Sequence, residues 1–187
     1  EAHRVQAVIV DAGDVLYHRP NRYRNLAAFL AGQGIDFSKF SREDTNRLEQ
    51  QAFKGEISRQ QYREALLRLY GISQPEQIDM GNHVLDEEDN NIKFFDGVWE
   101  TLHMLKRKGY LLGIITDTAV PLSVKLGWFE RGGFGEVWDS IISSQEIGVR
   151  KPAPMIYQTA LQQLGTPAGL AIFVGHKACE LEGARAA

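Results

Sequence analysis

The sequence predicts an α/β protein in which a doubly wound parallel sheet, a Rossmann-like core, carries an inserted all-helical cap. Three observations support this prediction. Four short apolar runs alternate with segments of helical periodicity, and parallel strands need such helical crossovers. Polar residues follow each apolar run directly. Residues 20–91 show helical patterns and no convincing strand pattern.

The first predicted strand is the one around which the rest of the chain is organised. Its residues, Val8 to Val10, are apolar and β-branched, and the run ends on Asp11 shortly before a glycine. A strand this short and apolar is typical of a parallel sheet covered on both faces. Ligands bind beyond the carboxyl ends of such strands. We therefore expect Asp11 at a functional site, although an acid that only caps the following turn would have the same pattern.

The inserted segment contains four amphipathic stretches. Asn21 is predicted to cap the first helix. Ser41 and Ser58 each begin a capping pattern, and Pro75 lies in the first turn of the fourth stretch. We therefore expect a helical cap over residues 20–91.

The core accounts for the rest of the chain, residues 1–19 and 92–187, with the first strand in its centre. A final helix pattern over 180–187 has no stop signal, so we expect that the core lacks its C-terminal end. The last predicted strand would then lie at an exposed edge. The predicted helices cover 98–108, 120–131 and 152–164, and the further strands cover 110–115, 138–143 and 171–175.

Composition excludes several classes of protein. The chain has 187 residues, of which 43% are hydrophobic, and a net charge of −3, with no basic block of the kind that binds nucleic acid. Its apolar runs are far shorter than a membrane span. A single cysteine, Cys179, rules out an internal disulfide framework. We expect a cytoplasmic protein that binds a small molecule and neither nucleic acid nor membrane.

Polar side chains should meet at one rim of the sheet, because each follows a strand at its carboxyl end. They are Asp11, Thr116, Lys151, and His176 with Glu180. In this order and spacing, and over essentially the whole chain, the sequence resembles the haloacid dehalogenase-like hydrolase superfamily, in the branch whose helical cap follows the first motif. The matching segments are residues 11–16, 95–98, 113–116, 151–157 and 173–175, with 183–184 beyond.

The resemblance implies a small-molecule phosphatase. Asp11 matches the family nucleophile, which forms an aspartyl-phosphate and so divides one difficult displacement into two easier ones. Thr116 and Lys151 match the family's donors to the transferred phosphoryl group. Asp117 and Arg22 are the substrate-binding candidates, since a guanidinium at Arg22 could bind an anionic group, although a solvated helix face has the same pattern.

Two positions depart from the family pattern. Gly13 stands where family phosphatases usually have the acid that protonates the leaving group, and His176 stands where they commonly have an aspartate that binds Mg²⁺. The metal ligands implied here are Asp11, the carbonyl of Gly13, His176 and Glu180. Mg²⁺ prefers oxygen ligands, whereas imidazole suits zinc, nickel or iron. Mg²⁺, another divalent metal and no metal therefore remain open, and Glu180 could instead hold Lys151.

The missing acid affects the expected chemistry. Asp14 is the nearest replacement, but neighbouring residues of an extended chain point to opposite sides. Losing general acid–base assistance slows a reaction by about 10²- to 10⁴-fold, so we expect slow hydrolysis that favours good leaving groups. Two alternatives stay open. A metal-free enzyme like the 2-haloacid dehalogenases would need neither an acid at position 13 nor a metal ligand at position 176. A catalytically degenerate protein of the same fold would bind without turnover.

Overall fold

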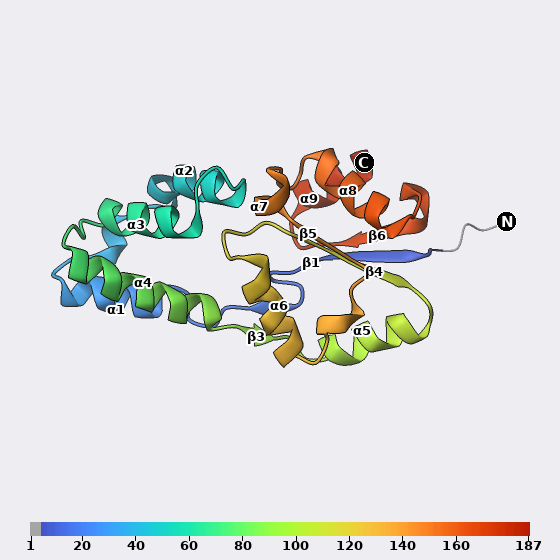
Figure 1. Cartoon of the computed structure of the whole chain (residues 1–187), viewed down its shortest axis with the longest axis horizontal. Helices are drawn as coiled ribbons and strands as arrows, with labels where there is room; N and C mark the ends of the chain where they lie inside the picture. Colours follow the sequence, from blue (N-terminus) through green and yellow to red (C-terminus); the bar gives the residue numbers. More distant parts are fainter. Residues whose placement is uncertain (1–4) are drawn as a thin grey trace.

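The structure is a computed structural model and describes residues 5–187. Its core is a four-stranded sheet in the order β5-β4-β1-β6, in which every pairing is parallel (Figure 1). This confirms the predicted fold class, with the first strand inside the sheet and the last at one edge. The strands are β1 (Ala7–Asp11), β4 (Leu111–Thr116), β5 (Ser140–Ser143) and β6 (Ala171–Val174).

Helices cover both faces of the sheet, α5 and α6 on one and α8 and α9 on the other, as Figure 1 shows. The helix expected from residue 152 begins at Pro154 instead, because a proline suits the first helical position, where no backbone N–H is needed. The core helices are α5 (Val98–Arg107), α6 (Leu122–Arg131), α7 (Ser144–Ile147), α8 (Pro154–Leu164) and α9 (Ala178–Ala186), with short 3₁₀ turns at Gly135–Val137 and Ala168–Leu170.

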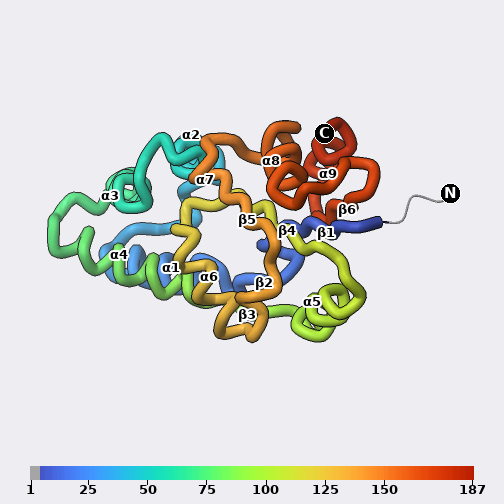
Figure 2. The backbone as a smooth tube through the Cα atoms, turned by 45° about the vertical axis from the view of Figure 1, so that its right-hand side comes forward, coloured from blue at the N-terminus to red at the C-terminus, as the bar shows by residue number. Residues whose placement is uncertain are grey.

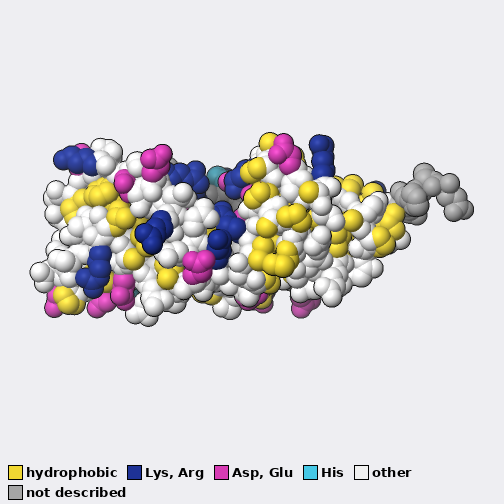
Figure 3. Space-filling view, turned by 90° about the horizontal axis from the view of Figure 1, so that it is seen from above, with side chains coloured by type: hydrophobic (Ala, Val, Ile, Leu, Met, Phe, Trp, Pro, Cys, Tyr) yellow, Lys and Arg dark blue, Asp and Glu magenta, His cyan; other side chains and the backbone are white. Residues whose placement is uncertain are grey.

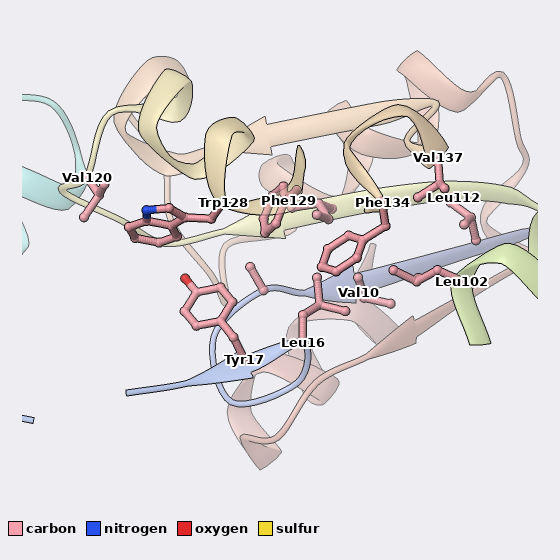
Figure 4. Packing of buried hydrophobic residues seen from close by; sticks show 12 residues of the cluster. Val10, Leu16, Tyr17, Leu102, Leu112, Val120, Trp128, Phe129, Phe134 and Val137 are labelled. Carbon is pink, nitrogen blue, oxygen red and sulfur yellow. The ribbon is translucent and has the colours of Figure 1, made fainter. Parts of the chain in front are cut away.

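Each face of the sheet packs against its own apolar cluster. Val10 points into the cluster under α5 and α6, where Trp128 and Phe129 are fully buried (Figure 4). Its neighbour Ile9 points to the opposite face and packs against Ile156 of α8. This alternation follows the two-residue period of a strand. It explains why β1 is apolar along its whole length, and it leaves Asp11 as the first charged residue of the strand.

A helical region lies beyond the carboxyl ends of the strands, at one end of the molecule in Figures 1 and 2. No strand occurs between residues 20 and 91, all of which the structure describes. No helix within residues 5–187 is both long and apolar enough to cross a membrane. The helices of this region are α1 (Arg24–Gly32), α2 (Arg42–Phe53), α3 (Arg59–Leu69) and α4 (Pro75–Asn90), with a 3₁₀ turn at Phe37–Lys39.

The helix starts of this region agree with the sequence patterns at three of four positions, since Pro75 is the first residue of α4. Ser41 and Ser58 each form a capping box with the residue three positions on. The prediction for Asn21 is wrong, because α1 begins at Arg24. The carboxylate of Glu88, on α4, accepts the backbone N–H groups at the start of α1: those of Tyr23, Asn25 and Leu26. An acid distant in the sequence thus caps the N-terminus of α1, and no local sequence pattern could reveal this contact.

Two short strands connect the helical region to the core. β2 (Tyr17–His18) pairs antiparallel with β3 (Lys93–Phe94), so that Tyr17 lies opposite Phe94. The chain enters the helical region through β2 and returns through β3. Strands of two residues carry no periodic pattern, so neither strand could be predicted from the sequence.

Candidate active site

A cavity of about 380 Å³ lies between the helical region and the carboxyl ends of the strands. Figure 3 shows Lys and Arg side chains around the hollow between the two parts. The structure brings all the site residues expected from the sequence to this one cavity. They are Asp11, Gly13, Arg22, Thr116, Asp117, Lys151, His176 and Glu180.

Asp11 is the centre of a buried charged cluster. Its Oδ1 lies 2.6 Å from Nζ of Lys151 and also accepts the backbone N–H of Ala12 at 2.8 Å. Nζ of Lys151 lies 3.2 Å from Oε2 of Glu180 as well. The three charged residues are at most 5% exposed. Because Oδ1 is doubly engaged, Oδ2 is the carboxylate oxygen of Asp11 left to react or to bind a metal.

The two acids of this cluster respond differently to their surroundings. Burial raises the pKa of the Asp11 carboxyl above its ordinary value, and the ammonium group of Lys151 only partly opposes this. Burial also acts to raise the pKa of Glu180, but the ammonium groups of Lys151 and Lys177 outweigh it and hold that pKa below its ordinary value. One lysine therefore serves two carboxylates, and Asp11 is the acid less well stabilised as an anion.

A divalent cation fits this cluster. Asp11, His176 and Glu180 each offer one ligand atom, and these atoms lie within 4.8 Å of one another. Oε2 of Glu180 is buried and, although it is close to Lys151, has no hydrogen-bond donor of suitable geometry. Because the one ammonium group near this oxygen, that of Lys151, also serves Asp11, a metal ion could take up the remaining lone pairs of the two buried carboxylates. The donor set contains oxygen and one imidazole nitrogen.

His176 lies between two carboxylates. Its Nδ1 is 3.4 Å from Oδ2 of Asp11, and its Nε2 is 3.7 Å from Oδ2 of Asp14. The expectation that Asp14 points away is wrong, because β1 ends at Asp11 and the chain then turns. Asp14 adopts a left-handed conformation, with φ of 57°, and its N–H bonds the carbonyl of Tyr17 at 2.8 Å.

Gly13 faces open space. Its backbone is outside the left-handed region, and a Cβ at this position would meet nothing within 4 Å. The position could therefore hold a side chain that reaches into the cavity. The carbonyl of Gly13 remains a candidate metal ligand.

Asp117 is engaged with the loop that carries Lys151. It accepts the backbone N–H of Lys151 at 3.1 Å and lies 3.4 Å from Nε of Arg150. Burial raises the pKa of its carboxyl, and these basic neighbours partly oppose the rise. Arg150 also donates to Gln50 of α2 at 2.6 Å. These contacts make Asp117 a support for the loop; it also lines the cavity, and its contact with substrate stays a prediction.

Arg22 is exposed at the side of the cavity formed by the helical region. Its guanidinium stacks 4.7 Å from the ring of Tyr23, and no acid pairs with it among residues 5–187. Among the other cavity arginines, Arg59 and Arg63 both contact Asp89, whereas Arg42, like Arg22, pairs with no acid within residues 5–187.

Two further residues, Lys125 and Tyr17, line the cavity although no sequence pattern pointed to them. Nζ of Lys125 donates to Oγ1 of Thr116 at 2.7 Å and to the hydroxyl of Tyr17 at 3.0 Å. A lysine in an amphipathic helix is ordinarily a surface residue, so local sequence held no signal for this placement.

Residues 37–187 match a family model described as haloacid dehalogenase-like hydrolase. The chain is 34% identical over 94 residues to pyrophosphatase PpaX of Bacillus velezensis, a match that covers 50% of this chain and 42% of that protein. It is 29% identical over 183 residues to glyceraldehyde 3-phosphate phosphatase of Methanopyrus kandleri, covering 92% and 76%. The matches to PpaX proteins thus span less than half of those relatives.

Solved structures share the fold. A haloacid dehalogenase family enzyme of Bacteroides thetaiotaomicron gives a TM-score of 0.74 at 18% identity, covering 98% of this chain and 90% of that one. Its complex with magnesium and inorganic phosphate gives 0.71 at 16% identity, covering 97% and 90%. A 2-haloacid dehalogenase of Pseudomonas syringae gives 0.67 at 20% identity, covering 97% and 83%. At these identities the likeness concerns the fold alone.

Proposed function

Because the chain belongs to the haloacid dehalogenase-like hydrolase family, we propose that it hydrolyses small phosphate esters through an aspartyl-phosphate on Asp11. One observation carries the proposal. Oδ1 of Asp11 is held by Lys151 and a backbone N–H, whereas Oδ2 carries neither bond and belongs to a residue that lines the cavity. The names of the phosphatase relatives support the same class of reaction.

The reaction has two displacements. In the first, Oδ2 of Asp11 forms a bond to phosphorus while the bond between phosphorus and the leaving-group oxygen breaks. In the second, a water oxygen attacks phosphorus and gives up its proton to solvent, the aspartyl–phosphate bond breaks, the Asp11 carboxylate is regenerated and inorganic phosphate is released. Lys151 balances negative charge on the phosphoryl oxygens, and Thr116 donates a hydrogen bond to one of them.

The leaving group departs without a proton from position 13, because Gly13 has no acid to offer. An alkoxide is a poor leaving group at neutral pH, whereas a phenolate or an acyl phosphate can leave unaided. We therefore assign to this enzyme a preference for good leaving groups.

A divalent cation would be held by Asp11, Glu180, His176 and the carbonyl of Gly13, and when bound it neutralises charge on the phosphoryl oxygens. The magnesium complex of the Bacteroides enzyme supports Mg²⁺ as the candidate. Nδ1 of His176, 3.4 Å from Oδ2 of Asp11, is the imidazole nitrogen that faces the Asp11 carboxylate, and Asp14 lies 3.7 Å from Nε2 on the other side of the ring.

We further propose that residues 20–91 form a cap domain over this site. Arg22 would bind an anionic group of the substrate from the cap side, since it is a cavity arginine without an acid partner within the described residues 5–187. Arg150 joins the Lys151 loop to α2 and so links the cap to the catalytic residues.

The test is a phosphatase screen of the purified protein with aryl, alkyl and acyl phosphates, each with added divalent metals and with a chelator. Metal-dependent hydrolysis, fastest for aryl and acyl phosphates, is expected. Acid-quenched protein should carry phosphate on the Asp11 peptide by mass spectrometry, and Asp11→Asn should carry none. Hydrolysis retained in Asp11→Asn would refute the proposal.

The same preparation separates the alternatives. Halide release from a 2-haloacid in the presence of chelator would identify a dehalogenase, a function compatible with the direct contact of Lys151 and Asp11. Phosphate binding without turnover in any assay would identify a degenerate binding protein.

A further inference from the structure

Lys125 is a buried cation without an acid partner. Its side chain lies on α6, is 3% exposed, and lines the cavity. No Asp or Glu pairs with its Nζ in the part of the chain that the structure describes. The rings of Tyr17 and Trp128 lie 5.6 and 5.9 Å from Nζ. A buried ammonium group without an anion is unfavourable, and an apolar residue of similar size would suit this place better for stability alone.

The hydrogen bonds of Lys125 determine what its neighbours can do. An ammonium group has three donors and no acceptor. Nζ donates to Oγ1 of Thr116 and to the hydroxyl of Tyr17, so each hydroxyl oxygen acts as an acceptor toward the lysine. Each hydroxyl hydrogen must then point away from Nζ. Neither hydroxyl donates to another protein group among residues 5–187.

We propose that Lys125 is a positioning residue of the phosphate site, which turns the hydroxyls of Thr116 and Tyr17 into donors directed at a bound oxyanion. The charge of Lys125 adds to that of Lys151, which lines the same cavity. This inference rests on the proposed phosphatase function. The ligand class is a phosphate monoester or the inorganic phosphate released from it.

The two hydroxyls come from different elements that meet at the Nζ of Lys125. Thr116 ends β4, the strand that pairs with β1, and so lies beside Asp11. Tyr17 belongs to β2, which leads into the helical region, and Figure 4 shows its hydroxyl oxygen turned toward Trp128 of α6. Lys125 therefore joins a donor on the sheet to a donor at the junction with the helical region.

The principal test is Lys125→Met, which keeps the apolar stem and removes the charge and all three donors. Its thermal unfolding temperature should equal or exceed that of the parent, because no ion pair is lost. Affinity for inorganic phosphate, measured by titration calorimetry with the metal that supports hydrolysis, should fall about tenfold. The value of kcat/KM should fall about 10²-fold, as it does when a preorganised donor is lost. Lys108→Met, at an exposed position outside the cavity, is the matched control and should change neither the phosphate affinity nor kcat/KM.

A double-mutant cycle separates positioning from packing. If Lys125 acts through Thr116, Lys125→Met should lower kcat/KM much less in a Thr116→Val background than in the parent. Tyr17→Phe leaves the lysine in place and should weaken phosphate binding by itself.

Three results would overturn the inference. All three apply to a parent that hydrolyses phosphate esters. The first is that Lys125→Met leaves phosphate affinity and kcat/KM unchanged. The second is that its effect is fully additive with that of Thr116→Val, and the third is a large loss of stability with normal activity of the folded fraction. A parent that binds phosphate but hydrolyses nothing would instead contradict the proposed function. Phosphate binding by Lys125→Met and Tyr17→Phe would still test the positioning role in that case.

Discussion

The charged groups of the helical region and those of the cavity at the sheet differ in how completely they are paired. In the helical region, Arg63 places one guanidinium nitrogen 2.7 Å from Asp86 and another 2.7 Å from Asp89. At the sheet, Lys151 is shared by two acids, and Oε2 of Glu180 has no suitable donor. Paired charges on the helices hold elements together, whereas charges left incompletely paired at the sheet remain available to a substrate or a metal.

The strongest challenge to this comparison is Asp11→Asn. If the cavity charges exist for chemistry, this variant should lose about 10⁴-fold or more in kcat for aryl phosphates, because the nucleophile is gone while the fold is kept. Steady-state assays against the parent at equal concentrations of folded protein measure the loss. A drop of less than tenfold would mean that the reaction does not pass through Asp11.

Gly13→Asp should sharpen the comparison by adding an acid where the cavity lacks one. Since a Cβ there meets nothing within 4 Å and the backbone is not left-handed, the fold should tolerate the change. Hydrolysis of alkyl phosphates should rise by about 10²-fold, and that of aryl phosphates much less. The ratio of the two rates is the measurement. Equal rates for both ester types in the parent would show that Asp14 or His176 already supplies the proton.

Arg63→Met tests the other half of the comparison. Removing this guanidinium leaves Asp86 and Asp89 with fewer partners, and the free energy of unfolding should fall by about 1–3 kcal/mol, moderated by the half exposure of Asp86. Urea denaturation measures this free energy in the parent and in the variant. Arg68→Met, an exposed position on the same helix, is the control and should change stability by less than about 0.5 kcal/mol. Equal effects of both substitutions would show that the pairing carries no stability.

His176→Asp should change metal preference by a smaller factor. An all-oxygen donor set favours Mg²⁺, whereas the parent's imidazole favours zinc, nickel or iron. We expect Mg²⁺ to bind about tenfold more tightly in the variant, and Zn²⁺ more weakly, in calorimetric titrations of both proteins. An unchanged order of affinities would remove His176 from the metal site.

The smallest expected effect is on stability as a function of pH, in protein freed of metal by a chelator. Because the pKa of Asp11 is raised on folding, the folded state binds its proton more tightly than the unfolded state does. The contribution of Asp11 to the free energy of unfolding, taken as the difference between the parent and Asp11→Asn, should therefore fall as pH rises from the ordinary carboxyl value, about 3.9, through the raised one. Asp11→Asn should lack this decline and be the more stable protein at pH 7. A parent more stable than the variant at pH 7 would contradict the direction of the shift.

The sheet was predictable because periodicity and burial act locally. The apolar run from Val8 to Asp11 predicts a parallel strand that is covered on both faces. Because the strands are parallel, the polar residues that follow them are expected to meet at one edge of the sheet. The rest depended on contacts between distant segments. Glu88 caps α1 from another helix, Asp14 turns back toward His176 because the strand has already ended, and Lys125 is buried against Tyr17. No window of neighbouring residues contains these pairs, so local patterns could not predict them.

The pairing of Tyr17 with Phe94 has a consequence for how the molecule can be altered. It brings the two ends of the helical region side by side, so this region enters and leaves the core at one place. The length of a segment joined in this way has little effect on the entropy lost when the core folds, because the ends of the segment are held together by the strand pair. Its length and sequence can therefore change independently of the sheet. Under the proposed function, grafting a different helical region onto β2 and β3 would offer new substrate contacts to the same reacting groups.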